Sequence, residues 1–452
     1  IAMGCVATFL IFWSLSGLLI KIFTSIKSVY YKGVNSFVLR QFCSKINTTV
    51  FSTTIICLML FITISVLSAA LSMKNSMSSD LKKMCPVDIQ FTKISYEALR
   101  EAYATADKDS DDYEKATKIL EDSKLSISDT LKNNGFDVNE YLKNMTEYSV
   151  YQTGLEEMDT LGSLADEIRE KYPMVSFLSS VNFMKLSDYN KIATLYGNET
   201  YSLGDNEYLI VANFKTVADI RNMALKAGTK IDINGKTYSP KYQECKDGFI
   251  ELASQHINDG IFIVPDDALT DAQVYKCGMT ADYKADSNEE KYDIENKLDD
   301  ISKNIFNQTS YLSYNSKIDL AEASVGLGAL VTFIALYLGI IFLISSAAIL
   351  ALKELSDSAD NRERYGMIRK IGVDEKMINM ALFKQIGIFF AFPLLLAIIH
   401  SVFGIKFINL ILQTMGMSSM LASVGITFVF LVVIYGGYFI ITYLCSKSII
   451  RQ

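Results

Sequence analysis

Long stretches of the chain hold only apolar and small polar residues, and they alternate with segments that are crowded with charge. A helix needs about 20 apolar residues to cross the hydrocarbon core of a bilayer. Core helices of soluble proteins rarely run this far without a charged residue. We therefore predict five transmembrane helices, over residues 1–23, 47–73, 323–352, 385–405 and 420–446. The predicted fold class is a membrane protein with an α-helical transmembrane domain.

The short connections between these spans are rich in Lys and Arg. Residues 21–45 hold five basic residues and no acidic one, and residues 353–384 hold seven basic residues. Connections on the cytoplasmic side of a membrane carry an excess of Lys and Arg. We therefore place three segments in the cytoplasm, namely 24–46, 353–384 and the tail 447–452. Residues 74–322 then lie outside, and so does Ile1, which leads us to expect further residues upstream.

The outer segment, residues 74–322, contains 28 Lys and Arg and 44 Asp and Glu. This acidic balance is typical of a soluble domain beside a membrane, and attraction of a cationic ligand is the alternative. Its patterns predict helices over 113–145, 155–171 and 288–306, and strands over 208–214, 230–238 and 260–264. The Asn234-Gly235 pair predicts a two-residue hairpin turn. The segment is thus a large mixed α+β extracytoplasmic domain.

Both ends of the outer domain keep helical spacing of apolar residues beyond the adjacent spans. We predict helical stalks that continue the second span past Lys74 and lead into the third span from Leu312. The stalks either carry motion between the outer domain and the cytoplasm or only hold the domain away from the bilayer.

The cytoplasmic segment 24–46 contains a predicted amphipathic, lateral helix. Phe37, Val38 and Phe42 share one helical face, and Arg40 lies on another. Surrounded by basic residues, such a helix suits the inner membrane interface. A plain connector helix is the alternative.

The connection 353–384 has the most distinctive pattern of the chain. Tyr365, Ile368 and Ile371 form an apolar stripe at helical spacing, and Gly372 provides a stop. Four basic residues flank the stripe: Arg362, Arg364, Arg369 and Lys370. We predict a short exposed helix that docks on another protein, and contact with lipid headgroups is the alternative.

This connection resembles that of the FtsX-like permease family, the membrane subunits of MacB-fold ABC transporters. The family pattern is approximately R-R-x-E-I-x-x-L-R-A-I-G-A, and this chain offers Arg362, Arg364, Tyr365, Ile368, Arg369, Lys370, Ile371 and Gly372. It departs from the pattern at Gly366 and Met367, and at Lys370, where the family has a small residue. Leu39-Arg40-Gln41 is similar to the L-R-N/Q segment of the family's lateral helix. The number of spans and the size of the outer domain are most like the C-terminal half of a BceB-type permease.

The resemblance implies a permease subunit in a bacterial cell membrane. A separate cytoplasmic ABC-type ATPase dimer, which holds the ATP and Mg²⁺, would bind residues 362–372 and drive the outer domain by mechanotransmission. BceB-type members act with peptide antibiotics and lipid-linked ligands, often beside a sensor histidine kinase. The competing hypothesis is a signalling scaffold that transports nothing and regulates a cell-wall hydrolase or a sensor kinase.

The chain carries no Walker A, HExxH or GxSxG pattern. We therefore predict that it is not an enzyme and that it has no catalytic, cofactor-binding or metal-binding residues. The apolar runs, the first of them counted to Ile20, hold no Asp, Glu, Lys or Arg that could couple transport to an ion gradient, and His400 is interpreted as a polar residue at the outer interface. The energy would therefore come from another subunit. Membrane lipid is the expected surrounding, and no basic stripe predicts nucleic-acid binding. In the outer domain, Cys85, Cys245 and Cys277 allow either one disulfide, such as Cys245 with Cys277, or free thiols.

Overall fold

The structure, a computed structural model, describes residues 2–25, 33–102, 117, 119–173, 175, 179–304, 311–413 and 421–451. Within these ranges the side chains of residues 15–24, 42–48, 102, 302–304 and 421 are not described. The chain divides into two compact units. We call Ile1–Lys74, Gly328–Ile411 and Ser419–Gln452 the helical unit, and Asn75–Leu327 with Leu412–Ser418 the sheet domain.

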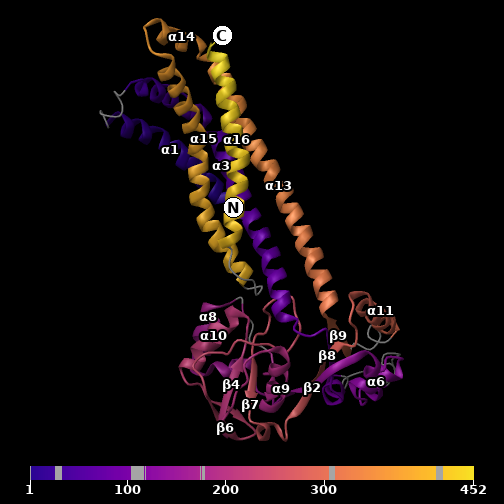
Figure 1. Cartoon of the computed structure of the whole chain (residues 1–452). Coiled ribbons are helices and arrows are strands. Elements are labelled where there is room, and N and C mark those ends of the chain that lie inside the picture. Colours follow the sequence, from indigo (N-terminus) through magenta and orange to yellow (C-terminus); the bar gives the residue numbers. More distant parts are fainter. Residues whose placement is uncertain are drawn as a thin grey trace. The chain divides into compact units, whose positions relative to one another are not determined.

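The helical unit is built from long helices that lie side by side (Figure 1). Its helices, some of which continue into the sheet domain, are α1 (Ala2–Ser25), α3 (Asn35–Met84), α13 (Lys317–Asp360), α14 (Arg362–Lys370), α15 (Glu375–Gln413) and α16 (Leu421–Arg451). Among the described residues, four segments are long and apolar enough to cross a membrane: Thr49–Met84, Lys317–Asp360, Glu375–Gln413 and Ala422–Arg451. They coincide with the second to fifth predicted spans, and the chain is a multi-pass membrane protein. The first predicted span, residues 1–23, is not confirmed, because the described apolar part of α1, Ala2–Ser14, is shorter than a membrane span.

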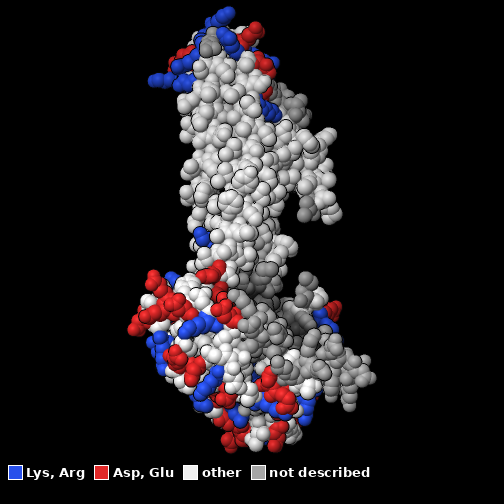
Figure 2. Space-filling model, turned by 90° about the vertical axis from the view of Figure 1, so that its right-hand side faces the viewer, with Lys and Arg blue, Asp and Glu red and all other residues white. Residues whose placement is uncertain are grey.

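Large apolar side chains cover the outside of the helical unit as well as filling its core. Phe333, Phe403 and Val433 are 70%, 68% and 66% exposed. On the face that Figure 2 shows, Lys, Arg, Asp and Glu are almost absent from the middle of this unit and gather at one end. Because a bilayer core contains no water, an apolar exterior of this kind is stable only in lipid.

Nine strands form the sheet of the other unit, in the order β5-β6-β4-β7-β3-β2-β8-β1-β9. Neighbours run antiparallel except for the parallel pairs β3–β7 and β4–β6. The strands are β1 (Ile89–Ile94), β2 (Leu142–Gln152), β3 (Phe183–Lys185), β4 (Glu207–Val211), β5 (Ile231–Ile233), β6 (Lys236–Pro240), β7 (Ile261–Val264), β8 (Gln273–Tyr283) and β9 (Leu312–Ser316). The helices are α4 (Tyr96–Ala102), α6 (Ile127–Asn133), α7 (Val138–Tyr141), η1 (Glu157–Leu164), α8 (Ala165–Lys171), α9 (Leu186–Tyr196), α10 (Lys215–Lys226), η2 (Asp266–Leu269) and α11 (Asn288–Asn304).

The two ends of the sheet domain meet in neighbouring strands. Strand β1 follows α3, and β9 leads directly into α13 (Figure 1). These strands pair antiparallel from Ile89 opposite Ser316 onward. The amide of Lys317 also donates to the carbonyl oxygen of Asp88 at 2.8 Å. The chain therefore enters and leaves the domain across one β-ladder.

The predicted hairpin is present, but one predicted helix is wrong. Strands β5 and β6 meet at Asn234-Gly235, and both residues have positive φ, 51° and 77°, as a two-residue hairpin turn requires. The predicted helix 113–145 is described only from residue 117, and there it is broken at Gly135, where φ is +90°. From Leu142 the segment is strand β2, because pairing with β8 determines its backbone.

The sheet domain buries charge as well as hydrocarbon. Arg221 on α10 is 2% exposed, and its Nη2 donates to Oε1 of Glu157 at 2.8 Å. Its Nε donates to the carbonyl oxygen of Asp259 at 2.6 Å, and its guanidinium lies 5.4 Å from the ring centroid of Phe262. Burial raises the pKa of the Glu157 carboxyl although Arg221 lies beside it. Replacing one partner of such a buried ion pair would leave the other charge buried and uncompensated, which destabilises the fold.

Candidate functional site

The predicted docking helix is present as α14, between α13 and α15. Gly372 ends it with φ at +92°, a conformation that favours glycine. The amide of Gly372 donates to the carbonyl oxygen of Arg369 at 3.1 Å, and that of Val373 donates to Ile368 at 3.3 Å. These bonds satisfy carbonyl groups at the end of the helix. The turn therefore holds α14 in a defined direction before α15 begins.

Tyr365 anchors α14 to the helical unit and is not part of an exposed stripe. Its side chain is fully buried, and its Oη donates to Oε1 of Gln385 on α15 at 2.9 Å. The ring of Phe37 packs edge-on against it at 5.2 Å. Burial raises the pKa of the Tyr365 hydroxyl, so the hydroxyl stays neutral. The prediction that Tyr365 faces outward with Ile368 and Ile371 is therefore wrong.

The exposed apolar edge of α14 consists of Met367 and one residue of the predicted stripe, Ile371, which caps the end of the helix. Met367 is 58% exposed and Ile371 is 80% exposed, whereas Ile368 is half-buried. Three of the predicted basic residues are exposed as well: Arg362, Arg364 and Lys370. The outward surface of α14 is thus a small apolar patch with basic neighbours, and its role in docking stays a prediction.

The fourth basic residue, Arg369, makes contacts inside the helical unit. Its Nε forms an ion pair with Oε1 of Glu375 at the start of α15. Its Nη1 and Nη2 each lie 3.4 Å from the carbonyl oxygen of Ile450, near the end of α16. Together with Tyr365, Arg369 fixes α14 to both neighbouring helices. A displacement of α14 would therefore act on α15 and α16.

The predicted lateral helix is the first part of α3, which begins at Asn35 and continues without a break to Met84. It is not the separate helix that we predicted within 24–46. Val38 is 2% exposed and Phe37 packs on the core of the helical unit, while Arg40 is exposed. The side chain of Phe42 lies outside the described residues. The apolar face of this segment therefore contacts protein at Phe37 and Val38.

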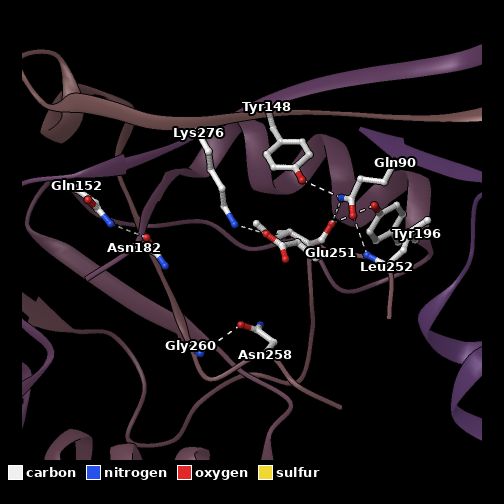
Figure 3. Close-up of polar contacts among 11 residues, drawn as sticks. Gln90, Tyr148, Gln152, Asn182, Tyr196, Glu251, Leu252, Asn258, Gly260 and Lys276 are labelled. Atoms are coloured by element: carbon white, nitrogen blue, oxygen red, sulfur yellow. Dashed lines mark hydrogen bonds and ion pairs between the residues drawn. The ribbon is translucent and has the colours of Figure 1, made fainter. Parts of the chain in front are cut away.

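A second candidate site lies in the sheet domain, at the loop between β6 and β7 (Figure 3). Gln90 is fully buried and binds this loop through both ends of its amide. Its Nε2 donates to the carbonyl oxygen of Ile250 at 2.7 Å and to Oη of Tyr148 at 2.8 Å, and the amide of Leu252 donates to its Oε1 at 2.8 Å. Tyr196 donates to the same Ile250 oxygen at 3.1 Å. The loop is thus held against the sheet.

Beside this loop is a cavity of about 120 Å³. It is lined by Met84, Val150, Asn182, Phe249, Ile250, Glu251, Ile257, Asn258, Asp259, Ile261 and Lys276. Lys276 and Glu251 form an ion pair in its wall (Figure 3). The cavity is smaller than the usual range of about 300–1,000 Å³ for small-molecule sites, so it could take one side-chain-sized group.

The same loop contacts the end of α3. Lys83 forms an ion pair with Asp247 at 3.1 Å, and His256 lies 3.4 Å from the carboxylate of Asp80. The Sγ of Cys85 donates to the carbonyl oxygen of Ala253 at 3.4 Å. The role of this loop could not be predicted from the sequence, because its residues follow neither helical nor strand periodicity. The one local signal is Gln90, a polar residue between Ile89 and Phe91.

The described cysteines are free thiols, so Cys245 and Cys277 are not bridged. Burial raises the pKa of Cys85 and of Cys245 to about 11 each. In the described part of the chain, no group of three or more His, Cys, Asp or Glu side chains is placed to hold a metal ion.

No known family model matches the chain. Curated bacterial proteins match part of it. ABC transporter permease protein YxdM of Bacillus subtilis is 31% identical over 93 residues, which is 21% of this chain. Bacitracin export permease protein BceB of Bacillus subtilis is 34% identical over 92 residues, and BceB of Halalkalibacterium halodurans is 28% identical over 105 residues, which are 20% and 23% of this chain. The matches span only 14% to 16% of the length of these relatives.

The fold and these similarities define a class, that of multi-pass membrane proteins similar to ABC transporter permeases. Within that class, the predicted resemblance to BceB-type permeases is confirmed.

Proposed function

We propose that this chain is part of the permease subunit of a BceB-type ABC transporter and that α14 is the surface on which a separate cytoplasmic ATPase docks. One observation carries the proposal. Helix α14 presents Met367 and Ile371 outward, while Tyr365 and Arg369 fix its other side to α15 and α16. A short helix that is exposed on one side and firmly attached on the other is suited to receive a force and pass it on.

The proposal extends to the sheet domain, which we place outside the membrane. ATP hydrolysis in the partner would move α14 and the membrane helices, and the motion would reach the sheet domain through α3 and α13, which continue into it. The loop held by Gln90 contacts the end of α3 through Lys83 and Cys85. This loop is therefore a place where a ligand outside and a helix from the membrane could influence each other.

The substrate class follows from the relatives alone. Two of them are named for bacitracin export, so we propose that the complex handles antimicrobial peptides or the lipid-linked species on which such peptides act. We propose a bacterial cell membrane as the location.

The docking surface can be tested by purifying the full-length chain in mild detergent and identifying its partners by mass spectrometry. We expect an ABC-type ATPase to co-purify, and Ile371→Asp to lower its recovery roughly tenfold or more, because a charge in an apolar contact removes a central anchor. The matched control is Met145→Asp, which changes an apolar residue of the sheet domain that is 40% exposed and does not line the cavity beside the β6–β7 loop. This control should leave ATPase recovery unchanged.

Equal recovery with both variants would show that α14 is not the docking surface. Failure of the unchanged chain to bring down any ATPase, even after gentle crosslinking, would contradict the coupled-permease proposal as a whole. A co-purifying sensor histidine kinase would support a role in peptide sensing. A cell-wall hydrolase in its place would favour the scaffold hypothesis.

A further inference from the structure

A groove in the helical unit lies between the first part of α3 and the first turns of α15. Its volume is about 430 Å³, within the range of small-molecule sites. Its lining residues are mostly apolar: Asn35, Val38, Leu39, Phe383, Lys384, Gly387, Ile388 and Ala391. The groove is separate from the outward surface of α14 and from the cavity in the sheet domain.

The floor of the groove is kept open by small residues on α15. Gly387 has no side chain, and a Cβ there would first meet the ring of Phe439 on α16, at 3.9 Å. One turn later, Ala391 adds only a methyl group. Phe383 forms part of the rim and is 43% exposed. The result is a slot with hydrocarbon walls, suited to a flexible chain rather than to a flat or polar ligand.

One charged residue stands at this slot. The Nζ of Lys384 donates to Oδ1 of Asn35 at 3.0 Å, a neutral partner, and its side chain is exposed. None of the described residues that line the groove is acidic. The charge of Lys384 is therefore available to an anionic group that lies above the apolar slot. This pairing of a cation with hydrocarbon walls matches the chemistry of an anionic phospholipid.

The position of the groove along the helices agrees with this ligand. Lys384 is the last charged residue before the apolar run of α15, so it stands where the membrane core meets the interface. A Lys or Arg near the cytoplasmic surface of a membrane attracts anionic lipids by about 1 kcal/mol.

We propose that this groove holds one acyl chain of an anionic phospholipid and that Lys384 pairs with the headgroup. The inference goes beyond the proposed ATPase coupling and rests only on the placement of α3 and α15 in a membrane. The bound chain lies beside the anchor of α14, since Val38 lines the groove and the adjacent Phe37 packs on Tyr365. Lipid occupancy is thus a means of stabilising the attachment of α14.

The test uses the full-length chain in nanodiscs of equal parts phosphatidylglycerol and phosphatidylcholine, followed by native mass spectrometry of the lipids that stay bound. We expect about a fivefold preference for phosphatidylglycerol, the effect of one Lys at an anionic headgroup. Lys384→Gln should remove the preference but keep a bound lipid. Gly387→Leu should fill the slot and release the lipid of either kind. Ala391→Leu should do the same and serves if Gly387→Leu does not fold.

Two control variants match these changes. Lys376→Gln removes an exposed charge from the same helix outside the groove, and Gly425→Leu adds the same side chain where a Cβ would have no neighbour within 4 Å. Both should retain lipid as the unchanged chain does. Equal retention by Ala391→Leu and Gly425→Leu would overturn the proposal. A photoreactive residue in place of Ile388 should crosslink to lipid, and crosslinks to another polypeptide in its place would also overturn it. No ATPase is present in this assay, so its outcome is independent of the proposed function.

Discussion

The helical unit and the sheet domain place their large apolar side chains differently. In the helical unit Phe333 and Phe403 are about two-thirds exposed, whereas in the sheet domain Phe91 and Phe262 are fully buried. The surrounding solvent explains the difference, because lipid accepts apolar side chains and water does not. Extensive exposure of large apolar residues is therefore expected in the helical unit, whereas in the described part of the sheet domain it is confined to a few positions such as Ile257.

The buried polar groups of the helical unit and of the sheet domain also differ in the partners that they bond. In the helical unit, hydroxyls such as those of Thr53 and Thr54 donate to carbonyl oxygens of their own helix, at 2.9 and 2.7 Å. In the sheet domain, Gln90 and the pair Arg221–Glu157 join segments that are distant in sequence. Loss of one such group leaves a buried partner unsatisfied. The sheet domain should therefore be the more sensitive unit to polar substitutions.

The largest expected effect comes from Arg221. Arg221→Met should destabilise the sheet domain by about 3–5 kcal/mol, because it leaves Glu157 buried without its cation. Pulse proteolysis of the full-length chain in detergent and urea measures this, since the helical unit and the sheet domain give distinct fragments. The matched control is Arg169→Met, which removes an exposed pair with Asp166 and should cost less than about 1 kcal/mol.

A second change separates loss of the charge pair from loss of packing. Arg221→Met combined with Glu157→Leu should recover much of the lost stability, because no uncompensated charge remains. Equal stability of Arg221→Met and Arg169→Met would contradict the account of a buried pair.

A smaller effect is expected from added volume. A Cβ at Gly278 would lie 2.0 Å from the ring of Tyr148, which is itself buried and is hydrogen-bonded through its hydroxyl to Gln90. Gly278→Ala should therefore cost about 1–3 kcal/mol in the sheet domain. Gly425→Ala in α16 meets nothing within 4 Å and should cost no stability, because Ala has the higher helix propensity. Thermal unfolding of the two variants compares them directly, and a neutral Gly278→Ala would show that Tyr148 has room to shift.

The smallest effect concerns pH. Glu295 on α11 is buried and accepts a hydrogen bond from Tyr283, and burial raises the pKa of Glu295 from 4.5 to about 7. The folded domain therefore holds this proton more tightly than the unfolded chain does. Stability from this group is fully present below about pH 4.5 and is lost as the pH rises to about 7.

Glu295→Gln removes the titration, so the variant should gain in melting temperature relative to the unchanged chain between pH 5 and pH 7.5, by a few degrees. Differential scanning fluorimetry at both pH values measures the change. A relative loss at pH 7.5 would mean that the Glu295 carboxylate is better paired than its burial suggests.

The helical unit was the more predictable of the two from the sequence. The length of an apolar run is enough to identify a spanning helix, and four predicted spans coincide with helices of the structure. The stalks were predicted in part, because α3 reaches Met84 while β9 occupies the predicted start of the second stalk at Leu312. Helical spacing could not show that pairing of β9 with β1 takes precedence there.

Prediction was weaker wherever distant residues decide the outcome. The Asn234-Gly235 turn was found because its backbone requirement is local. Strand β2 was missed because its polar sequence becomes a strand only beside β8. The stripe at Tyr365 was identified, but its direction was not, because a helical pattern does not reveal which neighbour covers it. Phe37, which packs on Tyr365, is more than 300 residues away in the sequence. Gln385, which accepts its hydrogen bond, lies on the next helix.

The β1–β9 ladder gives the sheet domain the architecture of a domain that is inserted between α3 and α13. Its two ends leave the domain from adjacent strands, with Ile89 opposite Ser316, so the flanking helices need no more than one ladder between them. Everything from Ile94 to Leu312 can then change in length, or be exchanged for another module, without altering the separation at which α3 and α13 arrive. Evolution can thus vary or replace the sheet domain while leaving the membrane helices of this protein as they are.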